Sequence, residues 1–200
     1  MLAISVAIFT PSASADAQTT VLVLGDSISA AYGIQREQGW VHLLGERLAS
    51  IDPVYQVVNA SISGETTGGG LARLPAVLAT HDPAVVIIEL GGNDGLRGYP
   101  VARIRSNLEQ LVVTADPDRR DIILVGMQIP PNYGPRYTRS FQGLFEDISA
   151  EYGVALVPSF LESVALQPEL MQRDGIHPKA EAQYLLLDTL WPHVWPLLHR

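Results

Sequence analysis

Short, mostly apolar runs rich in β-branched residues, separated by stretches with helical spacing, constrain the fold of this chain most. The runs occupy residues 20–24, 55–58, 84–90, 121–125 and 154–157. Strands that are apolar on both faces are typical of a parallel sheet covered by helices on each side. The sequence therefore predicts a three-layer α/β domain.

The intervening segments predict the helices. Their apolar spacing places helices at residues 40–50, 71–80, 101–114 and 137–152, with a final helix after Pro178. Proline lacks a backbone N–H and clashes with the preceding turn. We therefore expect Pro75 to lie in the first turn of its helix or to kink it, and the final helix to fray near Pro192 and Pro196.

Length and the N-terminus bear on domains and location. A chain of 200 residues, 47% of them hydrophobic, suits one globular domain. Residues 2–9 form an apolar run too short to span a bilayer, and residues 13–15 and 15–17 read Ala-x-Ala. This pattern predicts a signal peptide over 1–17, a single domain over 18–200 and a periplasmic or secreted protein. No Lys or Arg precedes the run, which leaves an ordinary apolar segment as the alternative.

Charge and cysteine content exclude several classes of function. The net charge is −8, which argues against nucleic acid and against adsorption to anionic lipid. Cysteine is absent, so the chain has no thiolate nucleophile, no disulfide framework and no cysteine-based zinc site.

Candidate site residues follow the predicted strands. Ser27 follows the first strand, Gly64 the second and Asn93 the third, while Asp174 and His177 share a short segment near the C-terminus. Ligands of such sheets bind beyond the carboxyl ends of the strands. A serine hydroxyl becomes a nucleophile when a base takes its proton, and a carboxylate orients that base. These residues therefore predict a serine hydrolase.

Each signal also has a structural alternative. Ser27 is a suitable helix N-cap, Asp26 suits a turn or a cap, and Asp174 begins an Asp-Gly turn. Residues 25–29 read Gly-Asp-Ser-Ile-Ser, so the Gly-x-Ser-x-Gly nucleophile elbow is absent. A triad is recognised by geometry and not by its motif. Asn93 is either a turn residue or an amide donor to an oxyanion.

Four sequence blocks resemble those of a known family. They are Gly-Asp-Ser at 25–27, Gly64, Gly-Gly-Asn-Asp at 91–94 and Asp-Gly-Ile-His-Pro at 174–178. Their order and spacing resemble the SGNH (GDSL) hydrolase family, and longer stretches at 59–66, 71–75, 89–98 and 131–134 resemble its bacterial periplasmic members. The resemblance extends from about residue 21 to residue 192.

The resemblance implies roles for individual residues. It implies Ser27 as nucleophile, His177 as base and Asp174 as the acid that orients the base. It implies an oxyanion hole formed by the Ser27 N–H, the Gly64 N–H and the Asn93 amide. It also implies a flavodoxin-like α/β/α fold with a five-stranded parallel sheet, and hydrolysis of acyl esters and thioesters without metal or cofactor.

The resemblance further implies where the substrate binds. The segment that contains Asp94, Gly95, Leu96 and Tyr99 matches a mobile loop beside an acyl groove, although Tyr99 also suits an ordinary surface position. We expect a monomer that acts on a small acyl ester, lysophospholipid or acyl thioester, without nucleic acid or stable membrane insertion. The alternatives are a short-chain carbohydrate or xenobiotic acetylesterase and a catalytically silent binding module. The intact serine, acid and histidine set argues against the last.

Overall fold

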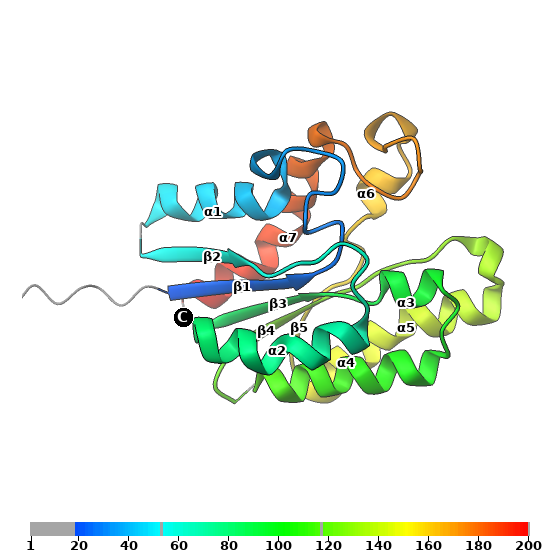
Figure 1. Cartoon of the computed structure of the whole chain (residues 1–200), viewed down its shortest axis with the longest axis horizontal. Coiled ribbons are helices and arrows are strands. Elements are labelled where there is room, and N and C mark those ends of the chain that lie inside the picture. The colour runs from blue at the N-terminus through cyan, green and yellow to red at the C-terminus, as the bar shows by residue number, and fades with distance from the viewer. Residues whose placement is uncertain (1–18, 53, 117, 200) are drawn as a thin grey trace, which may run out of the picture.

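A computed structural model describes residues 19–52, 54–116 and 118–199, so the predicted signal peptide lies outside the described residues. One parallel sheet forms the centre, with strand order β2-β1-β3-β4-β5 (Figure 1). The strands are β1 (Thr19–Gly25), β2 (Tyr55–Asn59), β3 (Val85–Glu89), β4 (Asp121–Val125) and β5 (Ala155–Val157). This order is the flavodoxin-like one. The predicted five-stranded parallel sheet is therefore confirmed.

Helices cover both faces of the sheet, which confirms the three-layer architecture (Figure 1). Alternate strand residues point to opposite faces, because side chains in a strand repeat with a period of two. Val21, Val23 and Ile87 join one core cluster with residues of α1 (Trp40–Ile51) and α7 (Gln183–Leu198).

The second core cluster occupies the other face. Leu22, Leu24 and Ile88 enter it from the strands, and three helices close it. These helices are α2 (Thr67–His81), α4 (Val101–Ala115) and α5 (Pro135–Tyr152). In the part of the chain that is described, no helix is both long enough and apolar enough to cross a membrane.

Helix α2 begins earlier than predicted. It starts at Thr67, and the Thr66 side chain caps it by accepting a hydrogen bond from the Gly69 N–H at 3.2 Å. Pro75 consequently lies in the helix interior, so its expected place in the first turn is wrong. The sequence pattern missed this turn because residues 68–70 are glycines, which disfavour a helix by about 1 kcal/mol each.

A close approach to the sheet explains one of these glycines. A Cβ atom at Gly70 would overlap the Leu90 side chain, which lies just past β3. A larger residue would therefore require the Leu90 side chain or the first turn of α2 to move. The low helix propensity of the glycine run is offset by packing, which local sequence reasoning does not register.

Helix α7 also departs from expectation. It begins at Gln183, after a 3-10 turn at Ala180–Ala182, and continues through Pro192 and Pro196 to Leu198. The expected fraying near the prolines is therefore wrong. Leu186, Leu190 and Val194 are fully buried on one side of the helix, and the Trp191 and Trp195 rings stack on each other. We attribute the persistence of the helix to this packing, since each proline removes only one backbone donor.

Candidate active site

The turn after β1 holds Ser27 in a fixed position. Asp26 lies between the end of the strand and this serine, and its Oδ1 accepts the Ile28 N–H at 3.1 Å. The Asp26 N–H in turn donates to Oε2 of Glu89 at 3.2 Å. A Cβ at Gly25 would lie 2.7 Å from the same Oε2 atom, so this position requires glycine. Asp26 is thus a turn residue, as one of its two sequence interpretations predicted.

The base is carried by a second loop, residues 171–178, which we call the base loop. Its ends are joined where Met171 and Pro178 form an isolated antiparallel bridge. Within it, the Gln172 N–H donates to the His177 carbonyl oxygen at 2.7 Å. Asp174 Oδ1 accepts the His177 N–H at 3.0 Å. The loop is therefore closed on itself and folded around its own acid.

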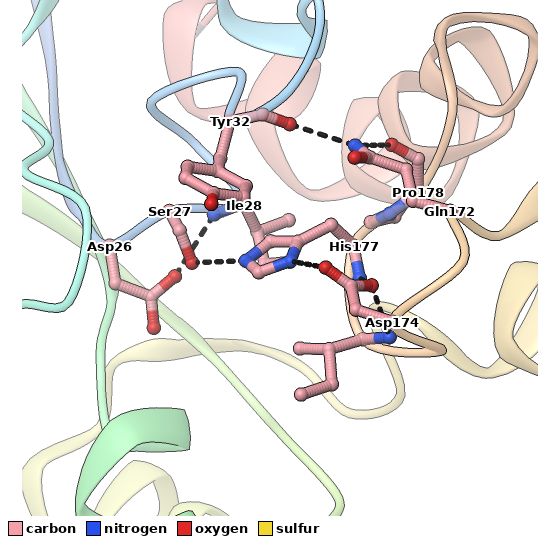
Figure 2. Close-up of polar contacts among 9 residues, drawn as sticks. Asp26, Ser27, Ile28, Tyr32, Gln172, Asp174, His177 and Pro178 are labelled. Atoms are coloured by element: carbon pink, nitrogen blue, oxygen red, sulfur yellow. Dashed lines mark hydrogen bonds and ion pairs between the residues drawn. The ribbon is translucent and has the colours of Figure 1, made fainter.

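The structure brings Ser27, His177 and Asp174 into one chain of contacts (Figure 2). His177 Nε2 lies 2.8 Å from Ser27 Oγ, and His177 Nδ1 lies 2.7 Å from Asp174 Oδ2. One tautomer serves both contacts: Nδ1–H donates to Asp174, and Nε2 accepts the Ser27 hydroxyl proton. This is the arrangement that a serine nucleophile requires.

The charge of Asp174 supports the same tautomer. Hydrogen bonds from the His177 side chain and from the His177 and Ile176 N–H groups lower the pKa of Asp174 to about 2. The carboxylate is therefore ionised near neutral pH, and it has no proton to give to the ring. An ionised acceptor at Nδ1 keeps a proton on that nitrogen and leaves Nε2 free to face the serine.

Asn93 lies in a short helix that contacts the nucleophile turn, and Gly64 lies in a loop that contacts the end of that helix. Asn93 is in the short helix α3 (Gly92–Leu96), and its Nδ2 donates to Oδ2 of Asp26 at 3.0 Å. Gly64 has φ +80°, a conformation that favours glycine. The Arg97 guanidinium donates to the Gly64 carbonyl oxygen at 3.1 Å, which ties this loop to the residue after α3.

Two buried carboxyl groups support this edge of the sheet, and the sequence reasoning gave Glu89 no role. Burial raises the pKa of Asp26 to about 6, although hydrogen bonds from Ile28 and Asn93 oppose the shift. Burial, and then repulsion from Asp26, raises the pKa of Glu89 well above its ordinary value. The one sequence signal for a buried carboxyl group was Glu89 itself, the single acid near the end of the otherwise apolar run at 84–90.

The four residues expected to bind substrate differ in their surroundings. Asp94 is 1% exposed, and its carboxylate accepts the N–H and the hydroxyl of Thr67 at 2.9 and 2.7 Å. Gly95 is also buried, since a Cβ there would lie 2.7 Å from the Ile129 side chain. Both residues belong to a helix and not to a loop. Asp94 therefore anchors the start of α2 and is directed away from solvent.

Leu96 and Tyr99 lie nearer the surface. Leu96 is half-buried, and its carbonyl oxygen accepts the Tyr133 hydroxyl at 2.6 Å. Tyr99 is also half-buried, and its carbonyl accepts the Tyr137 hydroxyl at 2.6 Å. The two hydroxyl donors line a hollow of about 510 Å³ together with Val101. This segment therefore lies beside a hollow of a size that suits a small ligand.

Comparison with known proteins places the chain in a family of hydrolases. The model of the GDSL-like Lipase/Acylhydrolase family matches residues 23–185. The chain is 53% identical over 182 residues to Esterase TesA of Pseudomonas aeruginosa, covering 91% of this chain and 90% of that protein. It is 41% identical over 185 residues to the thioesterase 1/protease 1/lysophospholipase L1 of Escherichia coli K12, covering 92% and 88%.

A solved structure agrees with the fold over most of its length. The psychrotrophic esterase EstA from a Pseudoalteromonas species, in a form inhibited by monoethylphosphonate, superposes with a TM-score of 0.85. The two sequences are 42% identical, and the match covers 92% of this chain and all of that one. The likeness therefore includes both the sheet and the loops at its carboxyl edge.

Proposed function

The chain belongs to the GDSL-like lipase/acylhydrolase family and is a serine hydrolase of esters and thioesters, and we propose that Ser27, His177 and Asp174 carry out its chemistry. One observation carries this assignment: His177 contacts Ser27 Oγ with one ring nitrogen and Asp174 with the other. The inhibition of the EstA esterase by a phosphonate is consistent with a nucleophilic serine in that relative.

In the first half of the reaction, Ser27 Oγ attacks the acyl carbonyl carbon while His177 Nε2 takes the hydroxyl proton. The resulting oxyanion accepts hydrogen bonds from the N–H groups of Ser27 and Gly64 and from the Asn93 amide. Donors that are already in position stabilise such a charge without reorganising. The tetrahedral intermediate then collapses, and the leaving alcohol or thiol departs with the proton held by His177.

In the second half, water hydrolyses the acyl-serine by the same route. His177 takes a proton from the water as its oxygen attacks the acyl carbon, and the same donors hold the new oxyanion. The bond to Ser27 Oγ then breaks, and His177 returns its proton to that oxygen. Free carboxylic acid leaves, and the enzyme is regenerated. Asp174 stabilises the imidazolium that forms in each half.

For substrate, we propose lysophospholipids and longer acyl esters or thioesters. The E. coli relative is named a thioesterase and a lysophospholipase, and the hollow beside Leu96 and Tyr99 is lined in part by Val101, Tyr133 and Tyr137. We further propose that residues 1–17 direct export and that the protein acts as a monomer outside the cytoplasm. Extracytoplasmic lipid would then be its source of substrate.

The decisive experiment compares Ser27→Ala with the wild-type protein and with Ser163→Ala, which changes an exposed serine of α6 (Glu162–Ala165). We expect Ser27→Ala to lose both ester hydrolysis and labelling by a fluorophosphonate probe, while Ser163→Ala retains both. Labelling of Ser27→Ala at the wild-type rate would refute the assignment. A panel of acyl chain lengths tests the substrate class, because activity confined to acetyl esters would indicate a short-chain acetylesterase instead.

A further inference from the structure

The contact between Ser27 and His177 joins two loops that lie far apart in the chain. The two residues are 150 positions apart, and their side chains meet through one hydrogen bond of 2.8 Å. Proton transfer depends steeply on this distance, and a displacement of about 1 Å in an active site can reduce turnover about 100-fold. Something other than this hydrogen bond must therefore fix the separation of the two loops.

The side-chain amide of Gln172 connects the loops directly (Figure 2). Its Nε2 donates at 2.8 Å to the carbonyl oxygen of Tyr32, which lies in residues 26–33 after β1, here called the nucleophile loop. It also donates to the Pro178 carbonyl oxygen at 3.1 Å, in the residue after His177. Both amide hydrogens are thus used, one across the gap and one within the base loop.

Backbone hydrogen bonds extend this connection to the reacting residues. The Tyr32 N–H donates to the Ser27 carbonyl oxygen at 3.1 Å, and the Gln172 N–H donates to the His177 carbonyl oxygen at 2.7 Å. Ser27, Tyr32, Gln172 and His177 therefore form a closed ring of hydrogen bonds. Three of its four links do not involve the atoms that exchange the proton, so they hold the geometry while the fourth link breaks and forms.

The nucleophile loop leaves space for this amide. Gly33 has φ +76°, and a Cβ there would overlap Oε1 of Gln172. The neighbouring Tyr32 ring lies against the His177 ring, with 4.5 Å between their centroids, although Tyr32 is 52% exposed. The same short segment therefore receives the Gln172 amide through its backbone and contacts the base through its ring.

We propose that Gln172 is a positioning residue that holds His177 at proton-transfer distance from Ser27 by joining the two loops. The inference rests on the proposed roles of Ser27 and His177. The Gln172 amide is bonded to the Tyr32 and Pro178 carbonyl oxygens and not to the atoms that exchange the proton, so we expect its loss to affect the chemical step and to leave substrate binding intact. The expected effect is therefore on kcat and not on KM.

The test replaces Gln172 with methionine, which has a similar length and shape but no hydrogen-bond donor. The matched control is Gln167→Met, since Gln167 is exposed and donates only to the Ser163 carbonyl within its own turn. Rates are expressed per active site titrated with a fluorophosphonate, so that loss of folded protein does not count as loss of turnover. Gln172→Met should lower kcat by about 10- to 100-fold and leave KM within about twofold.

The inactivation rate with the fluorophosphonate should fall in parallel with kcat, since it also depends on His177 activating Ser27. A Gln172→Met enzyme within about twofold of Gln167→Met would overturn the proposal, and so would a loss expressed only in KM. If Gln172→Met does not fold, Gln172→Leu, which also lacks a hydrogen-bond donor, decides by the same criteria. Inactive Ser27→Ala beside fully active Gln172→Met would refute the positioning role alone, whereas active Ser27→Ala would refute the proposed function.

Discussion

The Asn93 side-chain amide donates to Oδ2 of the buried Asp26 across 3.0 Å. The other oxygen of this carboxylate accepts the Ile28 N–H, so one acid fixes both the nucleophile turn and the amide beside it. Because an amide nitrogen carries two hydrogens, the bond to Asp26 determines where the second one points. Asp26 therefore orients the amide that we propose as an oxyanion donor.

Replacing Asp26 with asparagine should lower kcat by about 10- to 100-fold. An amide nitrogen facing the Asn93 Nδ2 offers a donor where an acceptor is needed, and a hydrogen bond to a charged group contributes about 1.5–3 kcal/mol. Steady-state kinetics on an aryl ester measures the effect. Unchanged kcat would show that Asn93 is oriented without this carboxylate.

The same substitution should change how stability depends on pH. Burial raises the pKa of Asp26 from 3.8 to about 6, so the folded protein binds more protons than the unfolded chain between these values. The raised pKa of Asp26 therefore adds to the free energy of unfolding below pH 3.8, and this contribution is lost as pH rises through 6. Asparagine does not titrate, so Asp26→Asn does not lose stability in this way.

We expect the free energy of unfolding of Asp26→Asn to rise relative to wild-type by up to about 3 kcal/mol across this range. Denaturant titrations of both proteins at a series of pH values measure the difference. Groups whose pKa does not depend on Asp26, such as Asp174, cancel in the comparison, whereas Glu89 adds to the difference because repulsion from Asp26 contributes to its raised pKa. A difference that stays constant with pH would mean that Asp26 has an ordinary pKa in the folded protein.

Asn93→Ala should lower kcat by about 10²- to 10³-fold, the usual effect of removing one oxyanion donor. The fold should remain intact, because α3 keeps its buried contacts through Asp94 and Gly95. Circular dichroism and kinetics on the same preparation test both statements. A rate near that of wild-type would remove Asn93 from the oxyanion hole.

Asp174→Asn should lower kcat by roughly 10⁴-fold, since an amide can stabilise the wrong tautomer of His177 and cannot offset the imidazolium charge. Hydrogen bonds, first of all from His177, hold the pKa of Asp174 near 2. Titration of Asp174 should therefore not shape the activity of the wild-type enzyme near neutral pH. A pH–rate profile of both proteins measures this, and equal kcat values would rule out an orienting role.

Two glycine substitutions should change stability in opposite directions. Gly95→Ala introduces a Cβ 2.7 Å from Ile129 and 2.9 Å from Phe141, and overpacking of this kind destabilises by about 1–3 kcal/mol. Gly143→Ala is in α5 with nothing within 4 Å, so it should stabilise by about 0.5–1 kcal/mol. Thermal unfolding of the two variants compares them, and a stable Gly95→Ala would mean that α3 shifts freely.

The sequence predicted the sheet because strands depend on strong local signals, whereas the triad was inferred from several signals that are each weak alone. Apolar runs located the strands, the carboxyl-edge rule placed Ser27, Gly64 and Asn93 at one edge, and the need of a serine nucleophile for a base linked His177 to Ser27. The start of α2 was not predictable from helix propensity, since glycine at position 70 suits the close approach of the Leu90 side chain and not the formation of a helix. Helix α7 persists past Pro192 because of packing that only the folded chain reveals.

The supporting residues were harder to find than the reacting ones. Neither Glu89 nor Gln172 was assigned a role from the sequence. Each contacts a segment distant in sequence, Glu89 through the Asp26 N–H and Gln172 through the Tyr32 carbonyl oxygen. Asp94 was expected near the substrate because of its place in a family block. Its carboxylate instead accepts hydrogen bonds from the N–H and the hydroxyl of Thr67. Reading roles from position along the chain cannot separate a residue that faces solvent from one that faces the core.

The two core clusters have a consequence for how such an enzyme can diverge. Ile28 and Met171, which flank the proton-transfer residues, pack in the cluster beneath α1 and α7. Leu90 and Ile129, which support the segment of Asn93 and Gly95, pack in the cluster on the opposite face. Substitutions in the second cluster should therefore move the segment of Asn93 and Gly95 with little effect on the loops that carry Ser27 and His177.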